Sequence, residues 1–282
     1  MKKKVLVISG ATGVGKTSCS IDLAKQFQGE IINGDAMQVY QGLDIGTAKI
    51  TKEEMEGISH HLIDCFPYTY SYNVKIFQEM ARAMVDEITA RGHLPIVCGG
   101  TGLYIKSLLY DYTFEIQEKD KEFLSFLSLL SNAQLYAILT HVDKGACETI
   151  HPHNRQRLIR AIEMAHSGKR KSDVIRSQAH EMLYDAYIIG LDMDRTHLYE
   201  RIDKRVEQMI KNGLYEEVSE LLKQDPQIWA RGCFQSIGYK EWKDHFQNGA
   251  SMEDCIKAIQ KNTRNFAKRQ YTWFHNQLPM HW

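Results

Sequence analysis

The sequence predicts an α/β fold in which a mostly parallel sheet is flanked by helices and interrupted by an inserted helical domain. Short apolar segments alternate with amphipathic helical segments, which is typical of a parallel sheet covered on both faces. A glycine-rich octapeptide stands between the first apolar segment and the first helical one. Between residues 113 and 184 the strand signal disappears, and the pattern becomes leucine-rich, polar and helical. We therefore expect a core formed by residues 1–112 and 185–282 and a helical insertion over residues 113–184.

Four strands are predicted, because four short runs are apolar and rich in β-branched residues. They cover residues 5–8, 30–33, 94–98 and 186–191. One amphipathic helix is predicted over residues 74–91, with Gly92 as its terminator. Another carries the stripe Leu198, Ile202 and Val206 and ends before Gly213. A third is expected near the C-terminus, where basic residues recur at helical spacing.

Composition is that of a globular chain able to bury a sizeable core. The 282 residues are 43% hydrophobic and 25% charged, and the formal net charge is +0. No run is long enough for a membrane span, so we expect a cytoplasmic protein with no membrane partner. The six cysteines form no CxxC pair and no zinc spacing, which suits reduced thiols.

The octapeptide GATGVGKT at residues 10–17 is a phosphate-binding P-loop in its strand, loop, helix setting. Glycines at 10, 13 and 15 allow positive φ, so that successive backbone N–H groups can face phosphate oxygens. The side chain of Lys16 adds a positive charge, and the hydroxyl of Thr17 can ligate Mg²⁺. The predicted diphosphate-binding residues are Gly10, Ala11, Thr12, Gly13, Val14, Gly15, Lys16 and Thr17.

Two aspartates, Asp35 and Asp192, each follow a predicted strand, where ligands of such sheets bind. Each can hold Mg²⁺, act as a base or cap the next turn. His60 and His61 have no carboxylate at ligand spacing, so hydrogen-bonded structural histidines are favoured over a metal site.

Two basic clusters stand out on this neutral chain. One lies in the insertion, and the other forms a helical stripe near the C-terminus. Either is a solvated surface or a contact for a phosphate backbone. The first contains His153, Arg155, Arg157, Arg160, Lys169, Arg170 and Lys171, and the second Lys257, Lys261, Arg264, Lys268 and Arg269.

Six further blocks follow the P-loop in order. They are DAMQVY (35–40), DIGTAK (44–49), HHLID (60–64), GGTGLY (99–104), SIGYKE (236–241) and AKRQYTWF (267–274). With the P-loop they make the chain resemble the tRNA dimethylallyltransferase family, also called tRNA isopentenyltransferase, of the bacterial type. The resemblance runs from about residue 4 to residue 282 and implies the nucleotide-kinase-like P-loop fold.

This resemblance implies transfer of a dimethylallyl group from dimethylallyl diphosphate to the exocyclic amine of the adenosine 3′-adjacent to the anticodon in tRNA. Diphosphate would occupy the P-loop with Mg²⁺, and Lys16 would stabilise its charge. Asp35 is implied as the base and Thr101 as the threonine at the reacting centre. Arg201 and Arg205, four apart on a predicted helix, are both candidates for the diphosphate, with pairing to Glu200, Asp203 or Glu207 as the competing role.

The resemblance also implies binding of the tRNA anticodon loop with the target base flipped out. We expect the chain to act as a monomer. The implied tRNA-binding residues are Asp35, Ala36, Met37, Gln38, Thr101, Gln156, Arg157, Leu158, Ile159 and Arg160. Gln38 would offer both donor and acceptor groups.

Two other functions compete with this interpretation. A P-loop small-molecule or nucleotide kinase would transfer phosphate from ATP. A non-catalytic RNA-binding NTPase would use the basic clusters and would not need Asp35.

Overall fold

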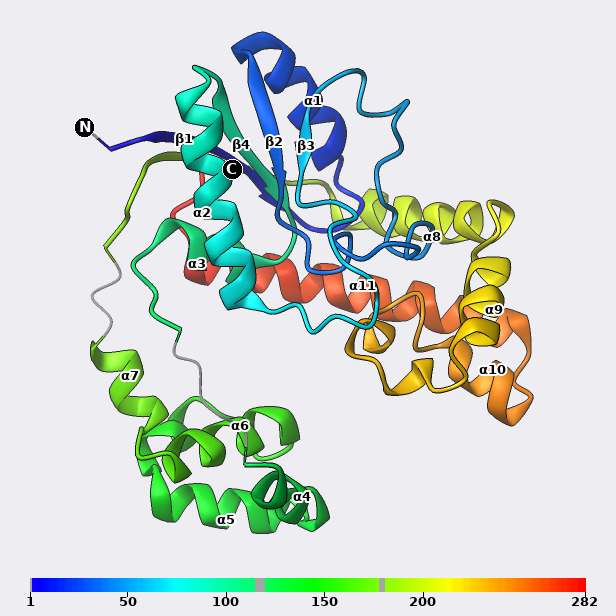
Figure 1. Ribbon diagram of the computed structural model, residues 1–282. Coiled ribbons are helices and arrows are strands. Elements are labelled where there is room, and N and C mark those ends of the chain that lie inside the picture. Colours follow the sequence, from blue (N-terminus) through cyan, green and yellow to red (C-terminus); the bar gives the residue numbers. More distant parts are fainter. Residues whose placement is uncertain (1, 115–119, 178–180) are drawn as a thin grey trace. The chain divides into compact units, whose positions relative to one another are not determined.

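The computed structural model describes residues 2–114, 120–177 and 181–282 (Figure 1). The chain divides into two compact units. The core unit comprises Met1–Tyr110 and Met182–Trp282, and the insertion unit comprises Asp111–Glu181.

The core unit contains one parallel sheet with the strand order β3-β2-β4-β1-β5. Its strands are β1 (Lys4–Gly10), β2 (Gly29–Asn33), β3 (His60–His61), β4 (Leu94–Gly99) and β5 (Asp185–Leu191). The four predicted strands are confirmed. The sequence prediction missed β3, because two residues are too few to show an alternating pattern.

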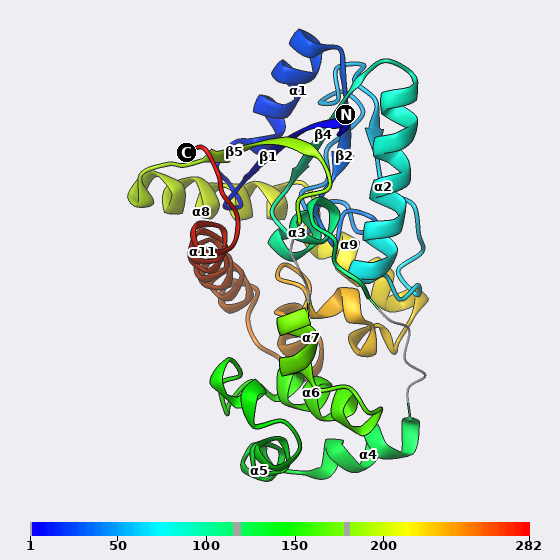
Figure 2. The same cartoon turned by 90° about the vertical axis from the view of Figure 1, so that its left-hand side faces the viewer.

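Side chains of β1 alternate between two apolar layers. Val5 and Val7 pack in the layer that contains Phe77 of α2 (Val74–Ala90) and Ile105 of α3 (Gly102–Leu109). Leu6 and Ile8 pack in the opposite layer with α1 (Lys16–Phe27). Figure 2 shows α1 and α2 on opposite sides of the sheet. This period of two fixes which face of each strand meets which helix.

The other helices of the core unit follow β5. They are α8 (Arg195–Lys211), α9 (Leu214–Gln224), η2 (Ile228–Ala230), η3 (Gly232–Gln235), α10 (Trp242–Asn248) and α11 (Met252–Gln277). The three predicted helices correspond to α2, α8 and α11, and Gly92 and Gly213 have φ of 81° and 99°. Leu198 and Ile202 of α8 pack with Ala11 and Val14 of the P-loop and with Ala267 of α11. Two distant helices therefore support the phosphate-binding loop.

The insertion unit is helical, and its core is separate from those of the core unit. Its elements are α4 (Lys121–Leu129), α5 (Asn132–Val142), η1 (Lys144–Glu148), α6 (Arg155–His166) and α7 (Lys171–Ser177). Leu127, Leu135, Leu139 and Leu158 are fully buried in its apolar cluster. Within the described ranges of the chain, no helix has the length and apolar character needed to cross a membrane.

Candidate active site

The P-loop has the backbone conformation that its glycines predict. Gly10, Gly13 and Gly15 have φ of 149°, 85° and 107°, values that residues with a Cβ rarely adopt. A Cβ on Gly10 would also lie 2.6 Å from the backbone oxygen of Leu191 in β5. The loop leads directly into the first turn of α1, where free backbone N–H groups favour an anion.

Lys16 is folded back onto the loop that it follows. Its Nζ donates hydrogen bonds to the backbone oxygens of Gly10 and Ala11, at 3.1 and 2.8 Å. Burial lowers the pKa of Lys16 to about 8; Arg205 adds to this effect, whereas Cys98 and Asp35 oppose it. Its positive charge is therefore sensitive to pH just above neutrality.

The two candidate arginines reach different points of the P-loop. Arg205 Nη1 donates to Thr12 Oγ1 at 3.4 Å, and burial lowers the pKa of its guanidinium. Arg201 is exposed, and its Nη2 lies 3.9 Å from the position that a Cβ on Gly15 would take. The competing ion pairs with acidic neighbours on α8 do not form in the described residues, and Asp203 pairs instead with Arg264. Both arginines therefore remain available to an anion on the loop.

Asp35 and Thr101 are brought together because β2 and β4 are adjacent strands. The backbone N–H of Ala36 donates to Thr101 Oγ1 at 3.2 Å, and the N–H of Thr101 donates to the backbone oxygen of Gly34 at 3.3 Å. The close approach requires glycine, since a Cβ on Gly99 would lie 2.3 Å from the carbonyl carbon of Gly34.

One oxygen of the Asp35 carboxylate has a structural role. Asp35 Oδ1 accepts from the backbone N–H of Met37 at 2.8 Å, which fixes the side chain in a turn, and Oδ2 makes no hydrogen bond in the described residues. Asp192 is different: its Oδ1 accepts from the N–H of Met193 at 2.7 Å, while Asp194 caps α8. Of the two, Asp35 is the carboxylate held beside the GGTGLY loop.

Gln38 differs from its expected role. Its Nε2 donates to the backbone oxygens of Thr47 and Ala48, both at 3.2 Å, so both amide hydrogens are engaged. The sequence predicts that Gln38 offers both donor and acceptor groups; in the structure Nε2 is engaged and Oε1 is left as an acceptor.

The DIGTAK loop that holds Gln38 is itself anchored by α9 and the SIGYKE block. Glu217 accepts from the backbone N–H groups of Asp44, Ile45 and Gly46, at 2.9, 2.7 and 3.1 Å. Tyr239 Oη donates to the same carboxylate at 2.6 Å. Two of the sequence blocks therefore meet in one hydrogen-bonded network.

The histidines of the HHLID block are structural, as expected. His61 Nε2 contacts Glu30 Oε2 at 2.6 Å, and His60 Nδ1 contacts the backbone oxygen of Ile58 at 2.8 Å. Across the described part of the chain, no three His, Cys, Asp or Glu residues gather as metal ligands. For a divalent cation, the exposed hydroxyl of Thr17 at the start of α1 is the candidate ligand, because it makes no hydrogen bond among the described residues.

In the insertion unit, Gln156, Arg157, Leu158, Ile159 and Arg160 occupy the first turns of α6. Gln156 and Arg157 are exposed, Leu158 is fully buried, and Ile159 is half-buried. Arg160 Nη1 pairs with Glu163 Oε2 at 2.7 Å. In the same basic cluster, Arg155 is a structural residue, since it donates to the backbone oxygens of Leu127, Ser128 and Leu130 at the end of α4.

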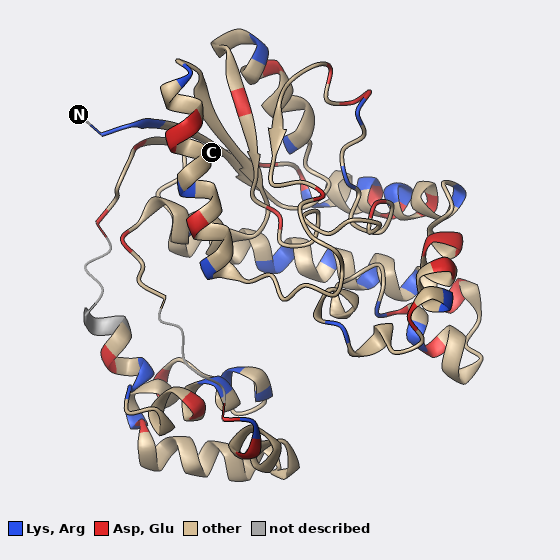
Figure 3. Ribbon diagram, viewed as in Figure 1, with Lys and Arg blue, Asp and Glu red and all other residues tan. Residues whose placement is uncertain are grey.

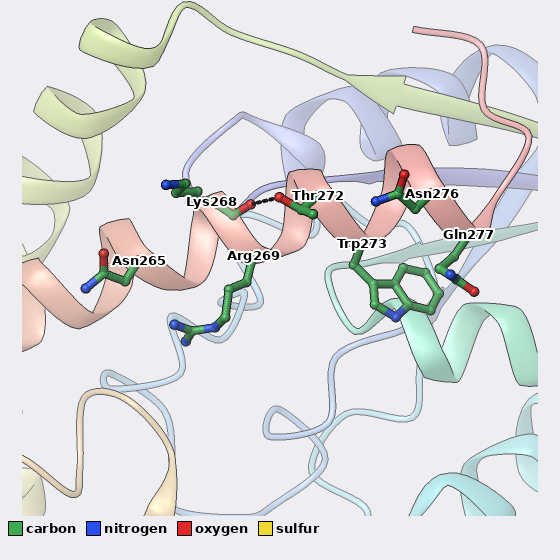
Figure 4. A pocket seen from close by; sticks show the side chains of 7 residues that line it. All are labelled: Asn265, Lys268, Arg269, Thr272, Trp273, Asn276 and Gln277. Atoms are coloured by element: carbon green, nitrogen blue, oxygen red, sulfur yellow. Dashed lines mark hydrogen bonds between the residues drawn. The ribbon is translucent and has the colours of Figure 1, made fainter. Parts of the chain in front are cut away.

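The C-terminal basic stripe lies along α11, where Figure 3 shows repeated Lys and Arg residues. Lys257 pairs with Glu253 at 2.6 Å, and Arg264 pairs with Asp203. Further along, one face of α11 lines an open groove of about 500 Å³ (Figure 4). Its lining residues are Asn265, Lys268, Arg269, Thr272, Trp273, Asn276 and Gln277.

This groove adjoins the GGTGLY loop. The ring of Trp273 covers Gly102, where a Cβ would come within 2.2 Å of the indole carbons. Gly102 directly follows Thr101. The groove thus places an aromatic ring next to the loop that contacts the Asp35 turn, and the same face of α11 carries Lys268 and Arg269.

Sequence reasoning assigned no role to Gln270. Its side chain is buried in α11 and bonds both the P-loop and the GGTGLY loop. It belongs to the AKRQYTWF block, so membership of that block was the one signal in the sequence.

Comparisons with known proteins identify the family of this chain. The IPP transferase family model matches residues 38–277, and the isopentenyl transferase model matches residues 3–67. A tRNA dimethylallyltransferase from Anoxybacillus flavithermus is 47% identical, over 100% of this chain and 90% of the relative. The enzyme of that name from Bacillus subtilis is 44% identical with the same coverage.

Two solved structures are also similar. A tRNA isopentenylpyrophosphate transferase from Staphylococcus epidermidis is 46% identical, with a TM-score of 0.73 over 100% of this chain and 92% of that one. A eukaryotic dimethylallyltransferase acting on tRNA is 32% identical, with a TM-score of 0.84 over 96% of this chain and 70% of that one. With its P-loop, Asp35 turn and GGTGLY loop assembled at one edge of the sheet, this chain belongs to the IPP transferase family of tRNA dimethylallyltransferases.

Proposed function

We propose that this chain transfers the dimethylallyl group of dimethylallyl diphosphate to the exocyclic amine of the adenosine 3′-adjacent to the anticodon of tRNA. The products are isopentenyladenosine and diphosphate. The observation that carries the proposal is relatedness over the whole chain to tRNA dimethylallyltransferases, at 44–47% identity. The site supports it, because a phosphate loop and a carboxylate turn lie at the carboxyl ends of the parallel strands β1 and β2, on either side of β4 and its GGTGLY loop.

The diphosphate of the prenyl donor is assigned to the P-loop. As the allylic C–O bond breaks, negative charge grows on the leaving diphosphate, and donors that are already in place stabilise it. Lys16 and the N-terminal amides of α1 supply such donors. Arg205 at Thr12 and Arg201 near Gly15 approach the same loop from α8. We assign Arg205 to the inner side of the diphosphate and Arg201 to its exposed side.

Mg²⁺ is the proposed cofactor, with the Thr17 hydroxyl as its protein ligand. A single exposed hydroxyl fits this ion, because Mg²⁺ keeps several waters and takes its remaining oxygens from substrate phosphates. When bound, the ion neutralises charge on the diphosphate.

Asp35 is assigned as the base. The adenine amine must lose a proton when it attacks carbon, and the free Oδ2 of Asp35 can accept that proton. The bond from the Met37 N–H to Oδ1 holds the carboxylate in place. Thr101 Oγ1, which accepts from the Ala36 N–H, keeps its own hydrogen to donate near the reacting centre.

RNA contacts are assigned to each unit separately. In the core unit, the RNA contacts are assigned to the 35–38 turn and to the α11 groove. In this groove, Lys268 and Arg269 can bind phosphate, and Trp273 offers an aromatic face to a base. Because the amide hydrogens of Gln38 are engaged, we assign its Oε1 to an N–H group of a base. In the insertion unit they are the exposed residues of the 156–160 turn. We take the chain to act as a cytoplasmic monomer.

The test is transfer of radiolabel from dimethylallyl diphosphate to unmodified tRNA in the presence of Mg²⁺. Wild-type protein is expected to label tRNA, and Asp35→Ala to reduce the rate by about 10²- to 10⁴-fold with a modest change in tRNA affinity. Phosphoryl transfer from ATP without labelled tRNA would instead favour a P-loop kinase. An Asp35→Ala variant with unchanged activity and RNA binding would favour an RNA-binding NTPase.

A further inference from the structure

Gln270 joins the two loops that bear the proposed reacting groups. It is only 6% exposed, and its side chain makes two hydrogen bonds of ordinary length. Oε1 accepts from the backbone N–H of Thr12 in the P-loop at 2.9 Å. Nε2 donates to the backbone oxygen of Gly100 in the GGTGLY loop at 2.9 Å. One amide therefore spans the ends of strands β1 and β4.

The two partners require a side chain that carries both an acceptor and a donor, and the amide supplies both. The Thr12 N–H needs an acceptor, and the Gly100 carbonyl needs a donor, so the amide has one possible orientation. Gly100 in the GGTGLY loop has no room for a side chain, since a Cβ there would lie 2.4 Å from Gln270 Nε2. A carboxylate would face the Gly100 oxygen with a second oxygen, and a methionine would leave both the Thr12 N–H and the Gly100 oxygen without this hydrogen-bond partner.

Each end of this bridge continues toward a reacting group. Thr12 contacts Arg205 through its hydroxyl, on the side assigned to diphosphate. Gly100 precedes Thr101, whose hydroxyl accepts from the N–H of Ala36 beside Asp35. The backbone N–H of Thr12 donates to Gln270, so it is not directed at the diphosphate site of the P-loop.

We propose that Gln270 is a positioning residue that sets the separation between the diphosphate site and the Asp35–Thr101 pair. The proposal rests on the proposed function, in which these two sites hold the leaving group and the base. Transfer requires the allylic carbon and the attacking nitrogen to meet in line, and a displacement of about 1 Å can cost roughly 10²-fold in rate. Loss of the bridge should thus affect the chemical step more than the binding of either substrate.

Gln78 provides the matched control. It is a second glutamine that is 6% exposed, and its Nε2 donates at 2.7 Å to the backbone oxygen of Ser107, which belongs to α3 and to neither loop. Gln78→Met and Gln270→Met should lower thermal stability by similar amounts. Only Gln270→Met is expected to slow single-turnover transfer, by about 10- to 100-fold, with the Kd for dimethylallyl diphosphate and for tRNA changed less than about threefold.

The Gln270→Glu variant gives a signature that lost stability cannot produce. When protonated, a carboxyl is nearly isosteric with the amide and can donate to Gly100 while accepting from Thr12. Burial raises the pKa of such a carboxyl. The rate of Gln270→Glu relative to wild type is therefore expected to rise as the pH falls below about 6.

Hydrogen exchange of the free protein tests the bridge without catalysis. Gln270→Met should speed exchange of amides in residues 10–16 and 99–101, and Gln78→Met should not. Equal rate losses in the two methionine variants, or a Gln270→Met variant with wild-type rate and exchange, would overturn the proposal. Absence of transfer by the wild-type protein would instead overturn the proposed function, and the exchange result would still decide whether Gln270 holds the loops.

Discussion

At the residue scale, Lys16 combines burial with a place in the phosphate loop. Burial lowers its pKa to about 8, so the free protein loses this positive charge as the pH rises through that value. A bound diphosphate favours the charged form, and its affinity should fall as the charge is lost.

We expect the Kd for dimethylallyl diphosphate to increase between about pH 7.5 and 9.5, by up to tenfold per pH unit above the pKa. Calorimetric titration across this range measures it. Lys16→Arg, which stays charged, should remove the dependence, and Lys268→Met on α11 should leave it intact. A wild-type Kd that is constant to about pH 9.5 would show that Lys16 is not the relevant charge.

Tertiary structure refined the sequence interpretation of several residues. Gln38 Nε2 donates to two backbone oxygens of the DIGTAK loop, so in this conformation its amide hydrogens are engaged within the protein. Arg201 and Arg205 share one face of α8, as their spacing predicts, but Arg201 is exposed, whereas Arg205 is half-buried against Thr12. Helical spacing cannot distinguish two residues on one face, because burial depends on what packs opposite them.

At the scale of elements, Glu30 ties β2 to β3 and to the end of α2. Its buried carboxylate accepts from Arg91 Nε and Nη2 at 3.0 and 2.8 Å, and it contacts His61 and His93 at 2.6 and 2.7 Å. Hydrogen bonds from Arg91, helped by those from the histidines, lower its pKa to about 2 against the opposing effect of burial. The folded-state pKa lies below the unfolded one, so this stabilisation is present above about pH 4.5 and is lost as the pH falls toward 2.

We expect Glu30→Gln to lower the free energy of unfolding by about 1–2 kcal/mol at neutral pH. That is less than the full pKa shift implies, because Arg91 and His93 are nearly half exposed. The difference in the free energy of unfolding between wild type and Glu30→Gln should become smaller as the pH falls. Urea denaturation at several pH values measures it, with Glu87→Gln as control, since exposed Glu87 is 3.9 Å from Arg91. A difference that stays constant down to about pH 2.5 would argue against the charge as its source.

At the scale of the whole molecule, the core and insertion units each have their own apolar cluster. The P-loop, the Asp35 turn and the GGTGLY loop all belong to the core unit. The exposed Arg157 belongs to the insertion unit and forms no ion pair in the described residues. Donor binding and part of the tRNA binding should therefore be separable by mutation.

We expect Arg157→Glu to weaken tRNA binding by about 3- to 10-fold at moderate salt. The dependence of the tRNA affinity on salt concentration should also become weaker, by the amount that corresponds to the loss of roughly one phosphate contact. Its Kd for dimethylallyl diphosphate should be unchanged. Fluorescence anisotropy with labelled tRNA at several salt concentrations tests this. Lys144→Glu, an exposed change outside the basic cluster, is the control. Equal weakening in both variants would indicate a general effect of charge on the insertion unit.

Local features of this protein followed from sequence alone. The positive φ values of the P-loop, the four longer strands and the glycines after α2 and α8 depend on residues within a few positions of one another. The ordered blocks were sufficient to indicate the family, and with it the fold and the reaction.

Contacts between distant residues were decided only by tertiary structure. β3 exists because it pairs with β2, Glu30 is satisfied by residues 31 to 63 positions away, and Thr12 meets Gln270 across 258 positions. Periodicity records which face of an element is apolar, but it contains no information about which polar group arrives from another element. The bridge between the two loops therefore became visible only when β1, β4 and α11 were packed together.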